Sequence, residues 1–444
     1  MRVSVFGLGK LGAPLAAVFA ASGHDVVAVD VSPSVVDLVN AGTAPVSEPG
    51  LQDLMDAGRV RLRATLDPVE AVHASDATFV IVPTPSAPEG GFTNAYLLDA
   101  LRRIGAAVAT KSGYHAVNVT STVMPGSCDG ELRAALEEAS GRTVGVDLGL
   151  TYSPEFIALG SVVHDMLYPD VLLLGESDPR AGDLVSAIAT SSVRNDPALR
   201  RMSLVNAELV KISVNTYVTT KISFANMLGE ICDRLPGADA DVVTAAIGCD
   251  SRIGRKYLSA ATGYGGPCFP RDNRAFALLA SQLGVEATLA KATDVVNKRQ
   301  TERLHELVGM LASPGDVVAV LGLSYKPGTW FSEESAGLDL LRTLVSAGHE
   351  VLGHDPLALD GPVPLVEPGG TLSSDLADVL ARADVVVIAT AHPEYATLSR
   401  LRAHTVLDCW GTTDAAALPA DTSYVRLGRA AATRAVRQPA SAAA

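Results

Sequence analysis

A ten-residue segment in the second half of the chain, GYGGPCFPRD (residues 263–272), places one cysteine on a loop rich in glycine and proline. Glycine lets a ligand approach the backbone closely, and proline restricts the conformations of a loop. The thiol of Cys268 is therefore expected on a rigid turn rather than in an apolar core. A thiolate can attack an aldehyde, and the adduct can lose a hydride to give a thioester that water cleaves. We expect covalent redox chemistry here if the chain also binds a hydride acceptor.

A dinucleotide-binding motif at the start of the chain would supply that acceptor. The segment GLGKLG (residues 7–12) follows a predicted strand and precedes a predicted helix. Gly7 permits a tight turn, Gly9 lets a pyrophosphate approach the helix N-terminus, and Gly12 lets the helix pack against the strand. Asp30 ends the next predicted strand, where a carboxylate binds ribose hydroxyls and repels a 2′-phosphate. We therefore predict NAD, and not NADP, as the cofactor.

Three segments near the N-terminus recur in the same order near the C-terminus. VSVFGLG, SGHDVVAVD and SDATFVIVPTP correspond to VAVLGLS, AGHEVLGHD and ADVVVIATAHP. Apolar strands that alternate with helical patterns are typical of parallel sheets covered on both faces. The sequence thus predicts an α/β protein with two Rossmann-like, doubly wound domains. The second has Tyr325 and Lys326 in place of a glycine-rich phosphate loop, so we expect it to bind something other than a dinucleotide.

The middle of the chain has a different pattern. Residues 203–235 contain no proline and a single glycine, which predicts one long helix that joins the end domains and offers a dimer surface. We predict an NAD-binding Rossmann domain at 1–200, a central helical dimerisation domain at 201–305 and a C-terminal Rossmann-like domain at 306–427. The residues 428–444 are rich in alanine and arginine and are predicted to be a disordered tail.

Composition excludes several classes of function. The formal net charge is −14 and no dense block of lysine and arginine occurs, so nucleic acid and anionic membranes are not expected as partners. The five cysteines are scattered without a CxxC pair, which argues against a disulfide framework and a zinc site, and we predict no metal. The N-terminus lacks the apolar region of a signal peptide, and no apolar run could span a bilayer. We expect a cytoplasmic protein.

The chain resembles the nucleotide-sugar 6-dehydrogenases of the UDP-glucose/GDP-mannose dehydrogenase family. The resemblance rests on GLGKLGAPLA, VPTP, STV, SPEF, ELVKISVNTY, DSRIG, GYGGPCFPRD and GLSYKPGT, which follow one another in the family's order. It implies an NAD domain, a helical middle that forms a homodimer, and a C-terminal domain that holds the sugar nucleotide; higher assembly stays open. It also implies that two NAD molecules successively oxidise C6 of the sugar, from alcohol to carboxylate.

The resemblance assigns roles to individual residues. The catalytic residues it implies are Cys268 as the nucleophile, Lys211 and Asn215 as stabilisers of the oxyanion, and Asp272, Glu155 and Thr122 as the groups that activate and position water. Lys211 and Asn215 are four residues apart and so share one face of the predicted helix. The cofactor-binding residues implied are Gly7, Leu8, Gly9, Lys10, Leu11, Gly12, Asp30, Pro83, Thr84, Pro85, Ser121 and Arg271. The substrate-binding residues implied are Glu155, Phe156, Ile157, Lys211, Asn215, Arg252, Tyr257, Tyr264, Gly265, Tyr325 and Lys326, with Arg252 reaching the neighbouring subunit's substrate.

Several readings stay open at the level of sequence. Val35, Leu159 and Glu333 stand where many family members have charged residues, which leaves the contacts to NAD undetermined. We predict UDP-glucose as the substrate and UDP-glucuronate as the product, with TDP-glucose, a UDP-N-acetylhexosamine or GDP-mannose as alternatives. A two-electron β-hydroxyacid dehydrogenase and a non-catalytic sensor of sugar nucleotides are the competing functions.

Overall fold

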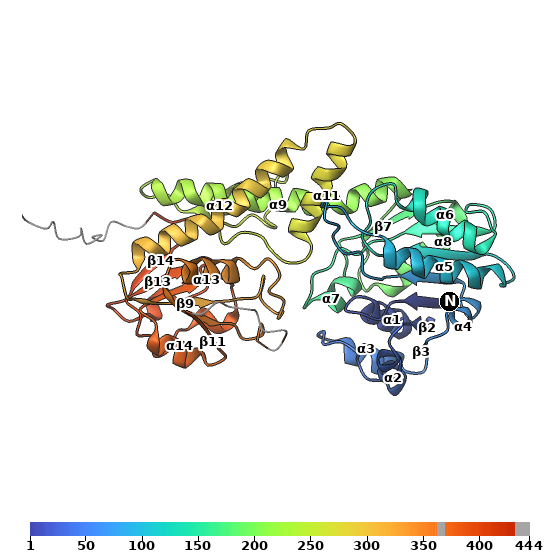
Figure 1. Ribbon diagram of the computed structural model, residues 1–444, viewed down its shortest axis with the longest axis horizontal. Helices are drawn as coiled ribbons and strands as arrows, with labels where there is room; N and C mark the ends of the chain where they lie inside the picture. Colours follow the sequence, from blue (N-terminus) through green and yellow to red (C-terminus); the bar gives the residue numbers. More distant parts are fainter. Residues whose placement is uncertain (360, 362–368, 431–444) are drawn as a thin grey trace, which may run out of the picture. The chain divides into compact units, whose positions relative to one another are not determined.

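The computed structural model describes residues 1–359, 361 and 369–430 of the chain (Figure 1). The chain divides into two compact units, Met1–Val214 and Asn215–Ala444. Each unit contains its own sheet, so the prediction of two α/β domains built on mainly parallel sheets, with helices between them in sequence, is confirmed.

The first unit is built on an eight-stranded sheet with the order β3-β2-β1-β4-β5-β6-β7-β8. Neighbouring strands run parallel except β6 and β7, which are antiparallel. The order reverses direction between β1 and β4, and in open α/β sheets ligands bind at the carboxyl ends of the strands at such a point. The strands are β1 (Arg2–Phe6), β2 (Asp25–Val29), β3 (Leu62–Thr65), β4 (Ala77–Val80), β5 (His115–Val119), β6 (Leu148–Tyr152), β7 (Val171–Glu176) and β8 (Ala198–Ser203).

Helices cover both faces of this sheet. In the central strand β1, Val3 and Val5 pack into the apolar cluster that contains α1, whereas Phe6 packs into the cluster that contains α5. Successive strand residues point to opposite faces, which is why the strand is apolar almost throughout. The helices are α1 (Gly12–Ala21), α2 (Pro33–Ala41), α3 (Leu51–Gly58), α4 (Pro68–His73), α5 (Ala95–Ala109), the π-helical turn η1 (Cys128–Leu132), α6 (Arg133–Ser140), α7 (Val162–Leu167) and α8 (Pro179–Ser192).

The second unit begins within the long helix α9 (Leu204–Arg234), which confirms the helix predicted over residues 203–235. Three further helices follow before the second sheet. They are α10 (Ala240–Gly248), α11 (Phe269–Gln282) and α12 (Thr288–Leu311). The loop that carries Cys268 leads directly into α11.

The second sheet has six strands among the described residues, in the order β11-β10-β9-β12-β13-β14, all parallel. Val318 and Val320 of β9 pack in the cluster with α13, and Ala319 and Leu321 in the cluster with α14, so the two helices cover opposite faces. The strands are β9 (Val317–Leu321), β10 (Glu350–His354), β11 (Gly370–Ser373), β12 (Val385–Ile388), β13 (Thr405–Asp408) and β14 (Ser423–Arg426). The helices are α13 (Ala336–Ser346), α14 (Leu376–Arg382) and the 3-10 turns η2 (Pro393–Ala396) and η3 (Ala415–Ala417).

The two sheets repeat one turn geometry after their central strand. Gly7 and Gly322 both have positive φ, 95° and 99°. A Cβ on Gly12 would lie 1.8 Å from the carbonyl oxygen of Gly7, and a Cβ on Gly337 would lie 2.0 Å from that of Gly322. The expectation that the second domain has no counterpart of the motif glycines is therefore wrong for the first and third glycines. The longer stretch between Gly322 and Gly337 hides the pattern in the sequence.

Asp355 ends β10 as Asp30 ends β2, but its carboxylate is used within the protein. It accepts hydrogen bonds from the backbone amides of Leu323, Ser324, Leu357 and Ala358, at 2.7 to 2.9 Å. It is 1% exposed. Because both oxygens are occupied by backbone amides, this carboxylate supports the fold of the domain itself.

The predicted division into three domains stays a prediction, since the compact units divide the chain at residue 214. The prediction of a disordered tail over residues 428–444 is wrong for residues 428–430, which make contacts within the second unit. The Gly428 amide donates to Asp233 Oδ1 at 2.7 Å, and Arg429 pairs with Asp239 at 2.6 Å. Residues 431–444 lie outside the described residues.

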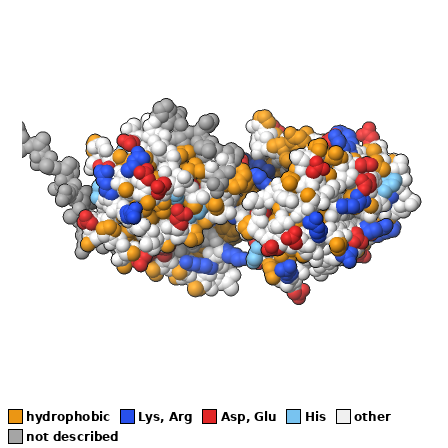
Figure 2. Space-filling model, turned by 90° about the horizontal axis from the view of Figure 1, so that it is seen from below, with side chains coloured by type: hydrophobic (Ala, Val, Ile, Leu, Met, Phe, Trp, Pro, Cys, Tyr) orange, Lys and Arg blue, Asp and Glu red, His pale blue; other side chains and the backbone are white. Residues whose placement is uncertain are grey.

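Two features are absent from the described residues, 1–359, 361 and 369–430. Within them, none of the helices is long and apolar enough to cross a membrane, and no group of three or more His, Cys, Asp or Glu side chains is arranged to hold a metal ion. On the face drawn in Figure 2, basic and acidic side chains are interspersed over both units instead of being gathered by sign.

Candidate active site

The turn after β1 has the geometry of a dinucleotide-binding loop. Gly7 has a φ of 95°, and a Cβ there would lie 2.4 Å from the carbonyl oxygen of Ile81. Packing within the chain therefore requires glycine at position 7, as it does at position 12. A Cβ on Gly9, in contrast, would meet nothing within 4 Å. Gly9 thus borders open space at the N-terminus of α1, where a pyrophosphate can approach the backbone.

Asp30 lies at the end of β2, next to this turn. Its carboxylate accepts hydrogen bonds from the backbone amides of Leu8 at 2.8 Å and Ser32 at 2.9 Å. These two bonds fix the carboxylate, and lone pairs remain for ribose hydroxyls because an ionised carboxylate accepts about four hydrogen bonds. Lys10 and Leu11 complete the turn into α1. The residues of this turn therefore fit NAD.

The loops after β4 and β5 are tied together by side chains that the sequence assigns to the cofactor. Ser121 Oγ accepts a hydrogen bond from the Val82 amide at 3.0 Å and donates to the Val82 carbonyl at 2.7 Å. Thr84, between Pro83 and Pro85, donates its hydroxyl to the Thr122 carbonyl at 2.7 Å. Ser121 and Thr84 therefore hold the two loops in register, while the side chain of Thr122 remains half-exposed.

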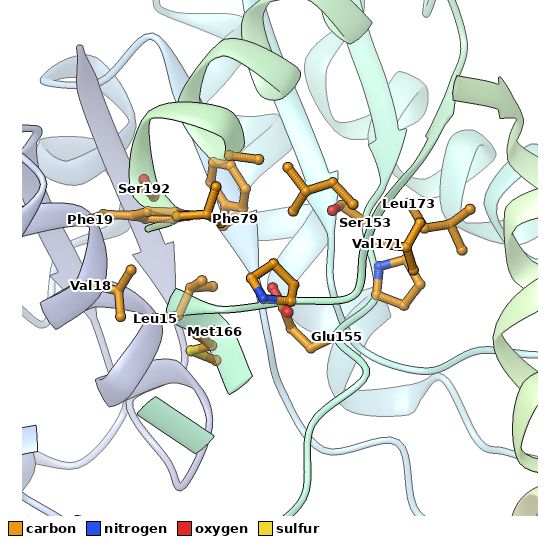
Figure 3. A pocket seen from close by; sticks show the side chains of 15 residues that line it. Leu15, Val18, Phe19, Phe79, Ser153, Glu155, Met166, Val171, Leu173 and Ser192 are labelled. Atoms are coloured by element: carbon orange, nitrogen blue, oxygen red, sulfur yellow. The ribbon is translucent and has the colours of Figure 1, made fainter. Parts of the chain in front are cut away.

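Glu155 follows β6 and lines a cavity within the first unit. The cavity offers a volume of about 40 Å³ to the centre of a water molecule, so it is large enough to hold water. The Glu155 side chain projects into this cavity, which Ser153 and Met166 also line (Figure 3). The residue as a whole is half-buried, but its carboxyl group is enclosed by protein. This burial raises the pKa of Glu155 to about 7, with the positive charge of Lys211 acting in the opposite direction.

Lys211 on α9 meets the segment that contains Glu155. It is 8% exposed, and its Nζ donates to the backbone carbonyl of Glu155 at 2.6 Å. The ammonium group also lies 4.8 Å from the ring centroid of Phe156, within cation–π range. Ile157 packs against the apolar core beneath α1. The structure thus brings the predicted residues Glu155, Phe156 and Lys211 together.

Cys268 immediately precedes α11, at its N-terminus, and is exposed. Negative charge is favoured at this end of a helix, so the position stabilises a thiolate. The four other cysteines in the chain are Cys128, Cys232, Cys249 and Cys409, and only Cys249 is also exposed. Cys268 therefore lies outside the apolar core, as expected, while its role stays a prediction.

Asp272 lies one helical turn after Cys268. Its side chain is 1% exposed, accepts a hydrogen bond from Asn215 Nδ2 at 2.6 Å, and lies 3.2 Å from Arg271 Nε. Its amide donates to the Cys268 carbonyl at 2.8 Å. The structure therefore joins four predicted site residues of the second unit, Asn215, Cys268, Arg271 and Asp272. Arg271, which was predicted to bind the cofactor, directs at least one of its hydrogen-bond donors to the Asp272 carboxylate.

Two of the three tyrosines predicted to bind substrate, Tyr264 and Tyr325, differ in their surroundings. Tyr264 is buried, and its hydroxyl donates to Asp294 at 2.6 Å, so this side chain anchors the loop instead of presenting a free hydroxyl. Tyr325 lies against Gly266, where a Cβ would come within 2.5 Å of the ring. Burial raises the pKa of Tyr325, and a negative charge on Cys268 would raise it further, which places the phenol near the thiol. Lys326 follows and is half-exposed.

Arg252 and Tyr257 lie on the exposed segment between α10 and α11. The Arg252 side chain is 86% exposed and pairs with Asp250 at 2.6 Å. Its predicted contact with another subunit therefore stays a prediction. Tyr257 has a φ of 61° and packs edge-on against Phe269, the residue that follows Cys268, at a centroid distance of 6.0 Å.

The three departures from the family's pattern have structural counterparts. Val35 and Leu159 both pack against the apolar core that contains α1. Near Leu159, the Glu48 carboxylate accepts hydrogen bonds from the amides of Gly160 at 3.1 Å and Val162 at 2.7 Å. Glu333 has an exposed side chain, but its carbonyl accepts a hydrogen bond from the Gly266 amide at 2.9 Å.

Glu208 is a functional candidate that the sequence reading missed. It is fully buried on α9, and its carboxylate accepts hydrogen bonds from the amides of Gly126 at 2.6 Å and Cys128 at 2.8 Å. It therefore anchors the loop that presents Thr122. The sequence contained a signal for this residue, because Glu208 precedes Lys211 by three residues, a spacing that places both on one side of a helix.

Models of one protein family match most of the chain. The NAD binding domain of the UDP-glucose/GDP-mannose dehydrogenase family matches residues 1–192. The family's central domain matches residues 205–299, and its UDP binding domain matches residues 319–415. The matches thus extend through both compact units.

Individual relatives agree with this assignment. The chain is 38% identical over 403 residues to the UDP-glucose 6-dehydrogenase of Haloferax volcanii, covering 90% of this chain and 93% of that protein. It is 35% identical over 404 residues to the GDP-mannose 6-dehydrogenase of Pseudomonas aeruginosa, covering 87% and 91%. A solved UDP-glucose dehydrogenase from Pyrobaculum islandicum has a TM-score of 0.88 at 35% identity, covering 97% of this chain and 98% of that one. The chain therefore belongs to the UDP-glucose/GDP-mannose dehydrogenase family and is an NAD-dependent nucleotide-sugar dehydrogenase.

Proposed function

We propose that this enzyme oxidises UDP-glucose at C6 to UDP-glucuronate in two successive steps through a covalent adduct on Cys268. The observation that carries the proposal is the exposed thiol at the N-terminus of α11, one turn before the buried carboxylate of Asp272. Bound NAD supplies the hydride acceptor for both oxidations. The turn with Gly9 and Asp30 would hold it, since this turn leaves open space beside the helix N-terminus.

Two oxidations and one hydrolysis would convert the C6 alcohol to the carboxylate. The C6 alcohol first loses a hydride and a proton and becomes an aldehyde. The thiolate adds to the aldehyde carbon, and the adduct loses a second hydride, which leaves a thioester. Water then adds to the thioester carbon, the carbon–sulfur bond breaks, and the carboxylate, the thiolate and two protons are released. Cys268 thus returns to its starting state after four electrons have left the substrate.

The other residues predicted for the site would stabilise charge and position the water. Lys211 and one amide hydrogen of Asn215 are donors suited to the oxyanion of the adduct, since the other Asn215 donor is already committed to Asp272. The Asp272 carboxylate is buried and held by hydrogen bonds. The Glu155 carboxyl group faces an enclosed cavity. Both surroundings suit a carboxylate that activates water. Thr122 would bind this water with its hydroxyl.

UDP-glucose is the proposed substrate because UDP-glucose dehydrogenases are among the most similar relatives along the full chain. Relatives that act on GDP-mannose keep GDP-mannose as an alternative, and TDP-glucose and UDP-N-acetylhexosamines remain chemically equivalent choices at C6. The test is NADH formation by the purified enzyme with a panel of UDP-, TDP- and GDP-sugars. We expect two NADH per UDP-glucose and the highest kcat/KM for this sugar.

The stoichiometry in this panel also separates the competing functions. A two-electron β-hydroxyacid dehydrogenase would form one NADH per substrate, and a sensor would form none. Oxidation of another nucleotide sugar with two NADH would correct the substrate but keep the chemistry. One NADH per sugar, with an aldehyde as the final product, would refute the proposed second oxidation.

Glu155 provides a pH-dependent test of the hydrolysis step. Its pKa is about 7 in the folded protein, so it is protonated in more acidic solution and ionised in more basic solution. If the carboxylate activates water, kcat falls about tenfold per pH unit on the acidic side of this pKa. The Glu155→Gln variant, measured from pH 5.5 to 9, should lose this limb and most of its hydrolysis rate. The matched control is Glu138→Gln, an exposed glutamate on α6. A limb that persists in Glu155→Gln belongs to another group.

We also propose that the enzyme is a homodimer formed through α9. Tyr217, Phe224 and Ile231 are 61%, 44% and 51% exposed. They recur every seven residues and so lie along one side of the helix, as in helix pairs that bury an apolar seam. Sedimentation velocity should show a dimer for the native chain and a smaller species for Phe224→Asp; a native monomer contradicts the proposal. The cytoplasmic location also remains a proposal.

A further inference from the structure

The loop before Cys268 packs directly against the segment 325–335. The Gly266 amide donates to the Glu333 carbonyl at 2.9 Å. A Cβ on Gly266 would lie 2.5 Å from the ring of Tyr325, and a Cβ on Gly265 would lie 2.0 Å from the carbonyl oxygen of Glu334. Two backbone segments that approach this closely leave little freedom to shift past each other. The position of the thiol therefore depends on how the segment 325–335 is held.

One ion pair connects this segment to the helix that follows Cys268. Arg274 on α11 donates to Glu334 through both terminal nitrogens, at 2.8 and 3.5 Å. The pair is bidentate, a geometry that fixes orientation as well as distance. The hydrogen bond that Arg274 donates to Glu334 raises the pKa of Arg274, which agrees with a close contact. Arg274 thus links the helix of the thiol to the segment that packs on its loop.

The backbone at Glu334 is held in an unfavourable conformation. Its φ is 47°, in the left-handed region that side-chain-bearing residues rarely adopt. Such a conformation persists only where the surrounding contacts determine it. Here Ser335, which is 1% exposed, caps α13 through its hydroxyl, and the Phe331 carbonyl accepts a hydrogen bond from the Tyr325 amide at 2.9 Å. The segment is therefore fixed at both ends, with Glu334 turned towards Arg274.

We propose that Arg274 and Glu334 are positioning residues whose ion pair sets the placement of the Cys268 loop for catalysis. This proposal rests on the proposed function of Cys268. Neither side chain needs to touch the substrate; both act through the backbone of residues 264–268. Their side chains are 46% and 45% exposed, and ion pairs this exposed contribute little to folding. Loss of the pair should therefore disturb the rate without unfolding the protein.

The test reverses the charge of each residue of the ion pair singly and then of both residues together. Arg274→Glu and Glu334→Arg should each lower kcat about tenfold, because small displacements of a reacting group have large effects on rate, with the KM for NAD unchanged. The double variant restores an ion pair of opposite polarity and should recover most of the lost kcat. The matched control is the exposed pair Lys291 and Glu286, which reversal should leave within about twofold of the native rate.

A second readout does not depend on the reaction. The rate of Cys268 alkylation by iodoacetamide, followed by mass spectrometry, should change at least about threefold in each single variant and return in the double variant. Unchanged kcat and unchanged alkylation in the single variants overturn the proposal, as does loss without recovery in a double variant that folds normally. If Cys268→Ser retained full turnover, the proposed function would fail, whereas the alkylation result would still report on the ion pair.

Discussion

Replacing Cys268 with serine should lower the rate of NADH formation from UDP-glucose by at least about a thousandfold. A thiolate is a strong nucleophile near neutral pH, whereas a serine hydroxyl is almost entirely protonated and needs a base to attack a carbonyl carbon. The position at the N-terminus of α11 stabilises the negative charge of a thiolate and leaves a neutral hydroxyl unactivated. The measurement is the initial rate at saturating sugar nucleotide and NAD, with UDP-glucuronate quantified in parallel.

Cys249→Ser is the matched control, because Cys249 is exposed as Cys268 is but lies after α10. It should retain the native rate. Glu155→Gln offers a positive test: when hydrolysis is slowed, mass spectrometry of enzyme trapped during turnover should find the sugar nucleotide attached to the peptide that contains Cys268. A Cys268→Ser enzyme that still forms two NADH per sugar, or a free thiol throughout such turnover, would exclude the covalent route.

Replacing Lys211 with methionine should lower kcat by about 10²- to 10³-fold, the range observed when one donor to an oxyanion is removed. Lys211 as a residue is 8% exposed. Methionine preserves most of its apolar stem but removes the ammonium group, which donates to the Glu155 carbonyl at 2.6 Å and lies over the Phe156 ring. The same substitution removes the positive charge that opposes the rise in the pKa of Glu155. The acidic limb of the pH profile should therefore move to higher pH.

Lys111→Met is the control for this variant. Lys111 is half-buried and, like Lys211, donates to a backbone carbonyl, that of Val72 at 2.7 Å, but it lies just before β5 and not among the predicted site residues. Its loss should lower the thermal stability and leave kcat within about threefold of the native value. If Lys211→Met keeps a similar kcat and a limb near pH 7, Lys211 has neither of the two roles assigned to it.

Residues with strict local requirements were the most readable from sequence. Gly7 and Gly12 stand where a Cβ would collide with backbone atoms, so only glycine fits at these two positions of the motif. The strands are short apolar runs and α9 is an unbroken helical stretch, and both patterns follow from the periodicity of the backbone. Cys268 was conspicuous for the same reason, since a thiol among glycines and prolines does not fit an apolar core.

Contacts between distant segments were not readable in this way. The sequence determined the cofactor turn, the repeated α/β units, the long helix and the accessible thiol, because each depends on neighbours a few residues away. Only the tertiary structure decided that Glu155 is enclosed, that Glu208 holds the Thr122 loop, that Tyr264 is committed to Asp294, and that Arg274 reaches Glu334. These side chains are ordinary polar residues by type, and their roles arise from burial and partners that folding brings together across tens of positions.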